Sequence, residues 1–291
     1  MICQMIKTIL KLIHPVDLFL SLLAFSIGAG IAKYLGYQIN LVSFWMGMLA
    51  VLALFAAASL LEEYFRFPLI GEVEREQERF KLTLLLVSYA TLAISTLCFL
   101  IIGIKFYYSI STLVLIIVSS LLLLACALPP LRFSKSGFGE LIKAIYLGTV
   151  LPILSYQLQA GEVHRLLSYV TFPLTLLALA YLLICNFSSF AFDLKSGYHT
   201  LLHRLTWQWA VPIHHILILI AFLIFAIGPL VDIPWGVIWP VFLVLPFGII
   251  QIIWLQRIAF GARPVWKFII NLSAATFGLT SYLLSLTFWT R

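Results

Sequence analysis

Long uncharged runs of apolar residues alternate with shorter polar segments along the 291-residue chain. A run of roughly 17–25 apolar residues is long enough to cross ~30 Å of hydrocarbon as a helix. The pattern predicts about nine membrane spans, over residues 16–36, 41–61, 82–103, 106–128, 138–160, 165–187, 212–230, 234–256 and 266–288.

The same pattern decides between the two structures that can span a bilayer. Inside lipid every backbone amide needs a partner within the protein, so a span is either a helix or a strand of a closed barrel. Barrel strands alternate apolar and polar residues, and these runs do not. We therefore expect an all-α fold, a polytopic bundle of about nine transmembrane helices in one integral membrane domain over residues 1–291.

Composition supports a membrane protein and excludes several other classes. Hydrophobic residues make up 63% of the chain and charged residues only 10%, whereas soluble domains are about 45–50% apolar and about 25% charged. A soluble enzyme, a disordered chain and a nucleic-acid-binding module are thereby excluded. The four cysteines show no CxxC spacing, so we expect free thiols.

The basic residues predict the orientation in the membrane. The N-terminus and the loops after the second, fourth, sixth and eighth predicted spans hold 14 of the 18 Lys and Arg residues, leaving Lys33, Lys105, Arg165 and Arg291 on the other side. Short loops rich in Lys and Arg stay in the cytoplasm. We expect a cytoplasmic N-terminus, and the net charge of +7 reflects topology rather than a nucleic-acid partner.

Acidic residues concentrate around the end of the second span and the loop after it. Glu62 and Glu63 are adjacent carboxylates that could hold a hard divalent cation on a phosphate group. Alternatively, Glu62 and Arg66 are four residues apart and could form an ion pair on one helix face. In the following loop the spacing predicts a solvated helix with ion pairs, and only Glu72, directly after Gly71, is a candidate ligand.

Two further cytoplasmic loops carry candidate residues. Pro129 and Pro130 stop the helix of the fourth span, and Arg132 and Lys135 then stand at the interface, where they could bind an anion or only set the topology.

The segment 186–204 contains one carboxylate, Asp193, which could form a surface pair with Lys195. His199 and His203 have a possible zinc-ligand spacing if that segment is helical.

Several of these segments together resemble one family. Residues 129–132 and 137–141 resemble the Pro-Pro loop and the Gly-Leu-Gly-Glu helix start of the UbiA superfamily of membrane prenyltransferases. The resemblance is closest to the 1,4-dihydroxy-2-naphthoate polyprenyltransferase branch of menaquinone synthesis. It continues through Gly148, Pro152, 156–161, 186–193, Gly197, 200–201 and 204–205.

This resemblance implies a function and a set of site residues. It implies Mg²⁺ bound between two acidic motifs, with an isoprenyl diphosphate and an aromatic quinone-precursor acceptor as partners, in a bacterial or archaeal cell membrane. Cations must neutralise the charge that a leaving diphosphate develops. The implied catalytic residues are Glu63 and Asp193, and the implied metal ligands are Glu62, Glu63, Glu72 and Asp193. The implied substrate-binding residues are Arg66, Arg132, Lys135, Asn186, Lys195 and Arg204.

Several motif positions differ from the family pattern and leave an alternative open. Glu62, Glu63 and Arg66 stand where the first family motif has Asn, Asp and Asp. Ser189 stands where the second motif has an aspartate, and Cys126 stands where family members often have a tyrosine. The alternative is a catalytically degenerate protein with the same fold that binds a prenyl lipid or a partner. A transporter is disfavoured, because we expect no carboxylate or histidine deep within a span and the two halves of the sequence do not repeat.

Overall fold

The computed structural model describes residues 8–66, 75–195, 197–231 and 233–291, which are helical and contain no strand. Nine helical segments within these ranges are long and apolar enough to cross a membrane. Seven of them are single helices: α2 Pro15–Tyr34, α3 Leu41–Arg66, α4 Arg75–Phe106, α5 Ile110–Ala127, α9 Arg165–Lys195, α10 Leu201–Ala226 and α13 Trp266–Thr290. The predicted all-α membrane bundle is confirmed.

The other two spans are built from shorter pieces. The fifth span joins α7 Gly139–Ile145, the π-helical turn η1 Tyr146–Val150 and α8 Leu151–Ala160. Pro152 follows the π-helical turn, and because proline has no N–H to donate, the regular helical hydrogen bonding is interrupted there. The eighth span joins α11 Trp235–Ile238, the 3₁₀ segment η3 Trp239–Val244 and α12 Leu245–Ala259. The short segments α6 Phe133–Ser136 and η2 Gly228–Val231 lie in connections.

Two predicted boundaries are wrong in a way that matters for function. The helix α9 continues past 187 to Lys195, so the predicted loop 186–193 is helical. The helix α10 begins at Leu201 rather than at 212, and Thr206, with φ 61°, breaks its regular geometry. The break at Thr206 separates residues 201–205 from the apolar part of α10, and the hydropathy pattern therefore did not include them in the span.

The earlier start of α10 also moves two histidines into the middle of a span. His214 is fully buried and neighbours Gln251 of α12, whose side chain donates a hydrogen bond to Thr276 of α13 at 3.1 Å. The expectation that no histidine lies deep within a span is therefore wrong.

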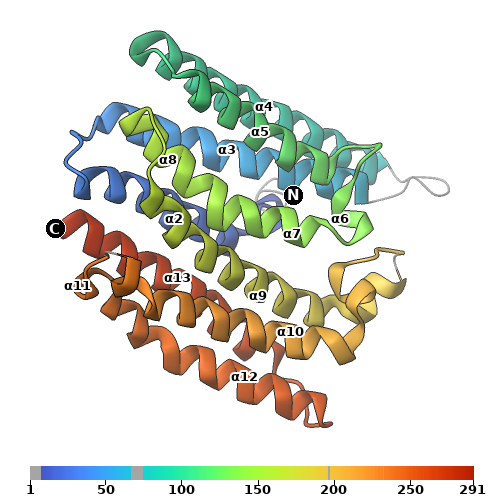
Figure 1. The fold of residues 1–291 in the computed structure, drawn as a ribbon. Coiled ribbons are helices and arrows are strands. Elements are labelled where there is room, and N and C mark those ends of the chain that lie inside the picture. Colours follow the sequence, from blue (N-terminus) through green and yellow to red (C-terminus); the bar gives the residue numbers. More distant parts are fainter. Residues whose placement is uncertain (1–7, 67–74, 196, 232) are drawn as a thin grey trace.

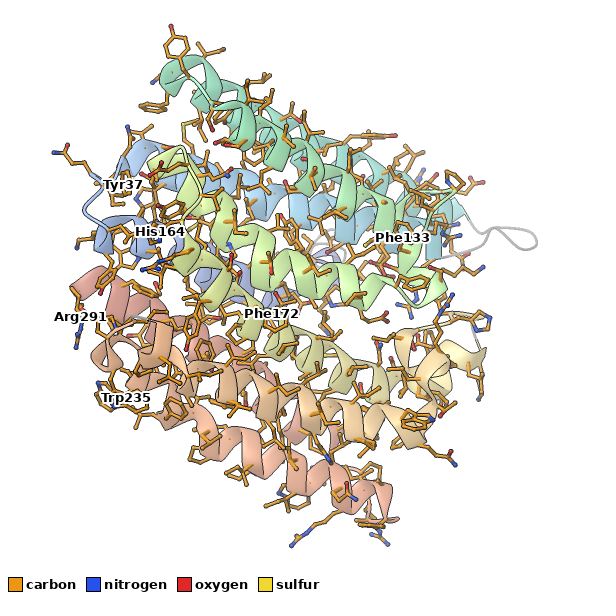
Figure 2. All side chains as sticks on the ribbon, viewed as in Figure 1. Tyr37, Phe133, His164, Phe172, Trp235 and Arg291 are labelled. Carbon is orange, nitrogen blue, oxygen red and sulfur yellow. The ribbon has the colours of Figure 1, made fainter. Side chains whose placement is uncertain are left out.

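The helices run back and forth between two ends of the bundle, with α4 packed against α3 at one edge and α12 at the opposite edge (Figure 1). Phe133 lies at one end, and Tyr37, His164, Trp235 and Arg291 lie at the other (Figure 2). We call the end that holds Phe133 the inner end, because the distribution of basic residues predicts that it faces the cytoplasm.

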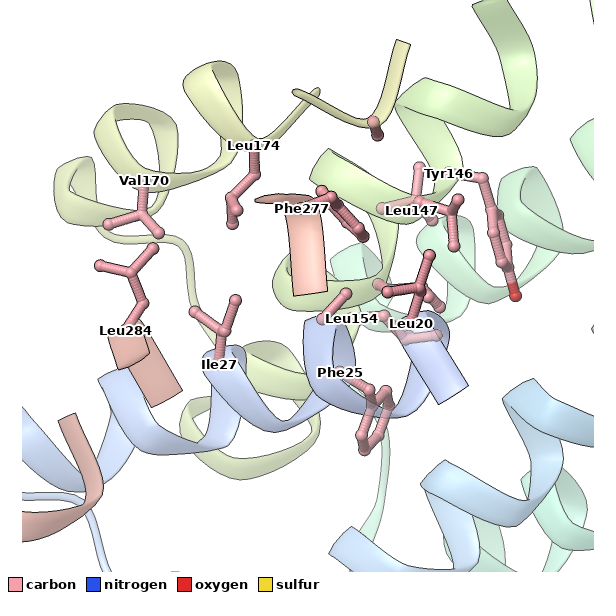
Figure 3. Close-up of a cluster of buried hydrophobic side chains, with 14 of the residues drawn as sticks. Leu20, Phe25, Ile27, Tyr146, Leu147, Leu154, Val170, Leu174, Phe277 and Leu284 are labelled. Carbon is pink, nitrogen blue, oxygen red and sulfur yellow. The ribbon is translucent and has the colours of Figure 1, made fainter. Parts of the chain in front are cut away.

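The core lies where α2, η1, α8, α9 and α13 meet (Figure 3). Buried side chains from all five segments gather there, including Leu20, Ile27, Leu147, Leu154, Val170, Leu174, Phe277 and Leu284. In lipid the hydrophobic effect does not drive helices together, so close packing of small residues and interhelical hydrogen bonds stabilise the contacts.

The contact between α2 and α8 is the tightest example. A Cβ atom added at Gly28 would lie 1.9 Å from the carbonyl oxygen of Pro152 and 2.8 Å from the backbone nitrogen of Tyr156. Next to it, the backbone N–H of Ala29 donates to Oγ of Ser155 at 3.2 Å. Only glycine at residue 28 lets the two backbones approach this closely.

We predict that Gly28→Ala lowers the stability of the bundle. Alanine in place of glycine gains about 1 kcal/mol of helix propensity, but overpacking costs about 1–3 kcal/mol, and here the clash is with backbone that cannot turn aside. We expect a net loss of about 2 kcal/mol, measured as a lower melting temperature of the purified protein in detergent.

The matched control is Gly278→Ala in α13. A Cβ there meets only the ends of the Leu20 and Leu23 side chains, at 3.0 and 3.8 Å. This variant should melt close to the wild type, and equal melting of Gly28→Ala would contradict the prediction.

Candidate functional site

A cavity of about 320 Å³ opens at the inner end, between α2, α3, α7 and α9. Its lining is rich in charged side chains that come from segments far apart in the sequence. The carboxylates among the lining residues are Asp17, Glu62, Glu63, Glu140 and Asp193, and the permanent cations are Arg66 and Lys143. Carboxylates therefore outnumber cations, and the cavity is expected to attract positive charge.

The centre of the site is an ion triad that joins the ends of α3 and α9. One nitrogen of Arg66, Nη2, lies 3.0 Å from Oδ1 of Asp193, and the other, Nη1, lies 3.3 Å from Oε1 of Glu63. Both carboxylates are buried. The two predicted catalytic carboxylates thus lie on either side of one guanidinium.

Aromatic rings complete the surroundings of Arg66. Its guanidinium carbon lies 5.4 Å from the ring centre of Phe192 and 4.9 Å from that of Tyr198. Such cation–π contacts help to fix the guanidinium in place.

Asp193 reaches this position because α9 is longer than predicted. Its side chain is only 5% exposed and also accepts a hydrogen bond from Oγ of Ser189, one helical turn earlier, at 2.5 Å. The interpretation of Asp193 as a surface partner of Lys195 is wrong, since Asp193 is buried against Arg66 while Lys195 is exposed.

Glu62 is paired across the cavity rather than along its own helix. Its Oε2 accepts a hydrogen bond from Nζ of Lys143 in α7 at 2.7 Å. The alternative ion pair between Glu62 and Arg66 is not formed, because Arg66 turns to Glu63 and Asp193 instead.

Glu140 forms a third buried polar contact. It accepts hydrogen bonds from Nδ2 of Asn186 at 2.8 Å and from the backbone N–H of Leu201 at 3.3 Å. The contacts join the start of α7 to α9 and to the first residue of α10. Asn186, predicted to bind substrate, therefore lines the cavity and is held by a carboxylate.

The remaining predicted residues do not all share this cavity. Arg132, Lys135 and Arg204 line a second hollow, formed between the α5–α6 connection and the start of α10. Lys195 lies exposed at the end of α9. Glu72 lies outside the described residues.

Sequence reasoning missed several residues that shape the cavity, among them Glu140, Lys143 and Tyr198. A signal for the first two was present, because Glu140 and Lys143 are spaced three apart and follow the Gly139 helix start. Tyr198 lies in the short connection between α9 and α10 and accepts a hydrogen bond from Arg132 at 3.2 Å. Burial raises the pKa of Tyr198 above its usual value despite the nearby Arg132 and Arg66, so its hydroxyl stays protonated at neutral pH.

The donor set fits a divalent cation only together with a bound phosphate. Among the described residues, no group of three His, Cys, Asp or Glu side chains is placed to hold a metal ion, and Arg66 occupies the position between Glu63 and Asp193. Mg²⁺ commonly binds one or two carboxylates and takes its other ligands from phosphate and water. The surplus of carboxylates in the cavity fits that mode, and the set Glu62, Glu63, Glu72 and Asp193 stays a prediction.

The histidine pair does not form the proposed zinc site. His199 precedes the first residue of α10, and its ring centre lies 6.2 Å from that of His203. Among the described residues, no third His, Cys, Asp or Glu is placed to complete a metal site with them. Nδ1 of His203 is instead hydrogen bonded with Oγ1 of Thr200 at 2.8 Å.

No family model and no curated protein matches this sequence. Solved structures do match. A UbiA homologue from Archaeoglobus fulgidus bound to GPP and Mg²⁺ aligns with a TM-score of 0.63 at 16% identity, over 97% of this chain and 98% of that chain. A digeranylgeranylglyceryl phosphate synthase aligns with a TM-score of 0.64 at 15% identity, over 99% and 98%. The apo structure of a UbiA homologue from Aeropyrum pernix K1 gives 0.60 at 15% identity, over 92% and 97%.

These likenesses establish that the chain has the fold of UbiA homologues, the fold of an integral multi-pass membrane protein. The resemblance predicted from the sequence is supported at this level, and the dihydroxynaphthoate branch stays a prediction.

We predict that Arg66→Met destabilises the protein and that Mg²⁺ restores part of the loss. Removing the cation leaves the buried Glu63 and Asp193 carboxylates without a counter-charge, which costs about 3 kcal/mol. A divalent cation bound between them would then neutralise the carboxylate pair. The measurement is the melting temperature in detergent with EDTA and with Mg²⁺.

The control is Arg79→Met, because Arg79 is exposed on α4 and forms none of the salt bridges found among the described residues. It should leave the melting temperature near that of the wild type, with or without Mg²⁺. If Arg66→Met melts like Arg79→Met, the triad does not have the structural role assigned to it.

Proposed function

We propose that this chain is a UbiA-type prenyltransferase-like protein that transfers a prenyl group from an isoprenyl diphosphate to an aromatic acceptor. The acceptor class is a quinone precursor such as 1,4-dihydroxy-2-naphthoate, which would give the protein a role in menaquinone synthesis in a bacterial or archaeal cell membrane. The observation that carries the proposal is the charged cavity at the inner end, where carboxylates of α3, α7 and α9 converge on two cations.

The charges in the cavity suit the ionisation of an allylic diphosphate. Breaking the C–O bond places negative charge on the departing diphosphate, and groups that already point at this charge lower the barrier most. Arg66 and Lys143 are the cations that line the cavity. Both are held by carboxylates at 2.7–3.3 Å, so both are oriented before a substrate arrives.

The apolar part of the lining suits the other half of such a substrate. Phe55 and Leu182 are buried and line the cavity beside its polar residues. A prenyl chain can lie against them while its diphosphate meets the charged groups. Tyr181 and Phe55 bring aromatic rings to the cavity lining, and the face of an aromatic ring stabilises positive charge in a dry site.

Magnesium is part of the proposal as a substrate-borne cation. When bound, it would neutralise diphosphate charge that two side-chain cations cannot balance within a cavity already rich in carboxylates. Glu63 and Asp193 are the residues best placed to hold it, from the two sides of Arg66. The structure of the Archaeoglobus fulgidus UbiA homologue bound to GPP and Mg²⁺ supports this assignment by analogy of fold.

One observation favours a second candidate function. Arg66 already satisfies both predicted catalytic carboxylates, as expected of a relative that retains the cavity and has lost the chemistry. Such a protein would bind a prenyl lipid or a partner without turning it over.

We predict Mg²⁺-dependent transfer from a radiolabelled prenyl diphosphate to 1,4-dihydroxy-2-naphthoate by the purified protein in liposomes. Glu63→Gln and Asp193→Asn should each lower the rate by about 10²-fold or more, because each removes a negative charge that would hold Mg²⁺, and loss of one preorganised electrostatic contact has effects of this size. The readout is labelled product separated by chromatography.

The control variant is Glu162→Gln, because Glu162 accepts a hydrogen bond from Tyr37 at the opposite end of the bundle. It should retain full activity. Turnover that is unchanged in Glu63→Gln and Asp193→Asn would refute the proposed site. Binding of the prenyl diphosphate without any product would favour the second candidate.

A further inference from the structure

A second hollow of about 640 Å³ lies at the inner end, outside the carboxylate-lined cavity. It lies between the α5–α6 connection and the start of α10. Its charged and titratable lining residues are all basic: Arg132, Lys135, His199, His203 and Arg204. The three permanent cations give this hollow a formal charge of about +3 at neutral pH, because Arg and Lys stay protonated there.

Arg132 is held in place by acceptors that leave its charge intact. Its Nη2 donates to the backbone carbonyl of Phe65 at 2.8 Å and to the Tyr198 hydroxyl at 3.2 Å. Neither acceptor carries a negative charge, so these contacts do not neutralise the guanidinium.

Arg204 is fixed in the same manner from the other side. Its Nε donates to the carbonyl of Ser136 at 2.6 Å, and its guanidinium lies 4.4 Å from the ring centre of Phe138. Gly137, with φ +80°, allows this approach, since a Cβ at that position would lie 2.8 Å from Cδ of Arg204. Residues 136–138 therefore hold the Arg204 side chain in place.

Within the described parts of the chain, none of these cations forms a salt bridge with a carboxylate. The salt bridges of the described residues join Arg66 to Glu63, Arg66 to Asp193 and Lys143 to Glu62, and none involves the second hollow. Nε2 of His203 is buried and has no hydrogen-bond partner among the described residues. Oriented cations and an unused ring nitrogen without a counter-charge are the features of an anion site.

We propose that this hollow binds the phosphate groups of an anionic ligand, either free diphosphate or the headgroup of an anionic phospholipid. Arginine forks suit phosphate oxygens because they can donate two parallel hydrogen bonds. Leu131 and Phe138 are 55% and 43% exposed beside the hollow, so an acyl chain can lie against apolar surface at the same place.

The two hollows differ in the sign of their charge, so their ligands can be told apart. The cavity around Arg66 has more carboxylates than cations and is expected to require a divalent cation for any phosphate ligand. The basic hollow already supplies the positive charge, and its binding should not require a metal ion. The proposal does not depend on prenyl transfer.

The test uses the full-length protein in the presence of EDTA. Inorganic diphosphate binding is measured by calorimetry in detergent. Phospholipid binding is measured as the rise in melting temperature when phosphatidylglycerol is added to phosphatidylcholine nanodiscs. The variant is Lys135→Gln/Arg204→Gln. The control is Arg257→Gln/Arg263→Gln, which removes the same charge from the last turn of α12 and from the α12–α13 connection.

We expect the wild type and the control to bind, and the Lys135→Gln/Arg204→Gln affinity to fall by about tenfold or more, because charge-assisted hydrogen bonds are lost. A response to diphosphate alone identifies a free phosphate ligand, and a response to phosphatidylglycerol alone identifies a lipid headgroup. The proposal is overturned if the wild type binds neither probe, or if both double variants lose binding equally. Binding that appears only when Mg²⁺ replaces EDTA also overturns it, and leaves the proposed prenyl transfer untouched.

Discussion

The guanidinium of Arg66 between Glu63 and Asp193 is the interaction on which the inner end depends. A charge buried at the edge of a membrane is tolerated only when it is paired and hydrogen bonded. Here one cation serves two buried carboxylates from different helices, and Arg66 and Asp193 are 127 residues apart in the chain. The pairing fixes the distance between the ends of α3 and α9, and the carboxylate-lined cavity is the space that this distance leaves.

The polar contacts around the triad also give charged groups of one helix a polar partner on another helix. Lys143 ties α7 to α3 through Glu62, and Glu140 ties α7 to α9 through Asn186. Arg132 and Tyr198 then separate this acidic region from the basic hollow. The inner end therefore presents two neighbouring sites of opposite charge on one rigid set of helices, which suits a protein whose ligands have an anionic head and an apolar tail.

The spans could be predicted from the sequence because length and hydropathy alone specify a bilayer helix. The polar ends of these helices could not be predicted in the same way. Residues such as Asn186, Ser189 and Asp193 are equally compatible with a solvated loop and with a helix whose polar face lines a cavity. The start of α10 was missed for the same reason, together with the break at Thr206.

The candidate site was predictable in part. The adjacent carboxylates Glu62 and Glu63 indicated a site by themselves, whereas Asp193 was indicated only by the family resemblance, and all three line the cavity. The choice of partners was not predictable. Glu62 has Arg66 one turn away, yet it pairs with Lys143 of a distant helix. Local spacing says which pairs are possible, and only the packing of α3, α7 and α9 decides among them.

The contact of Gly28 with Pro152 lies deep in the core, away from every charged residue of the inner end. The close packing of the core and the ion pairs of the inner end are thus specified by different residues in this chain. A designer could exchange the ionisable side chains of the inner end for other sets in which every buried carboxylate keeps a cationic partner, and could leave the α2–α8 contact unchanged, provided that residue 28 has no side chain.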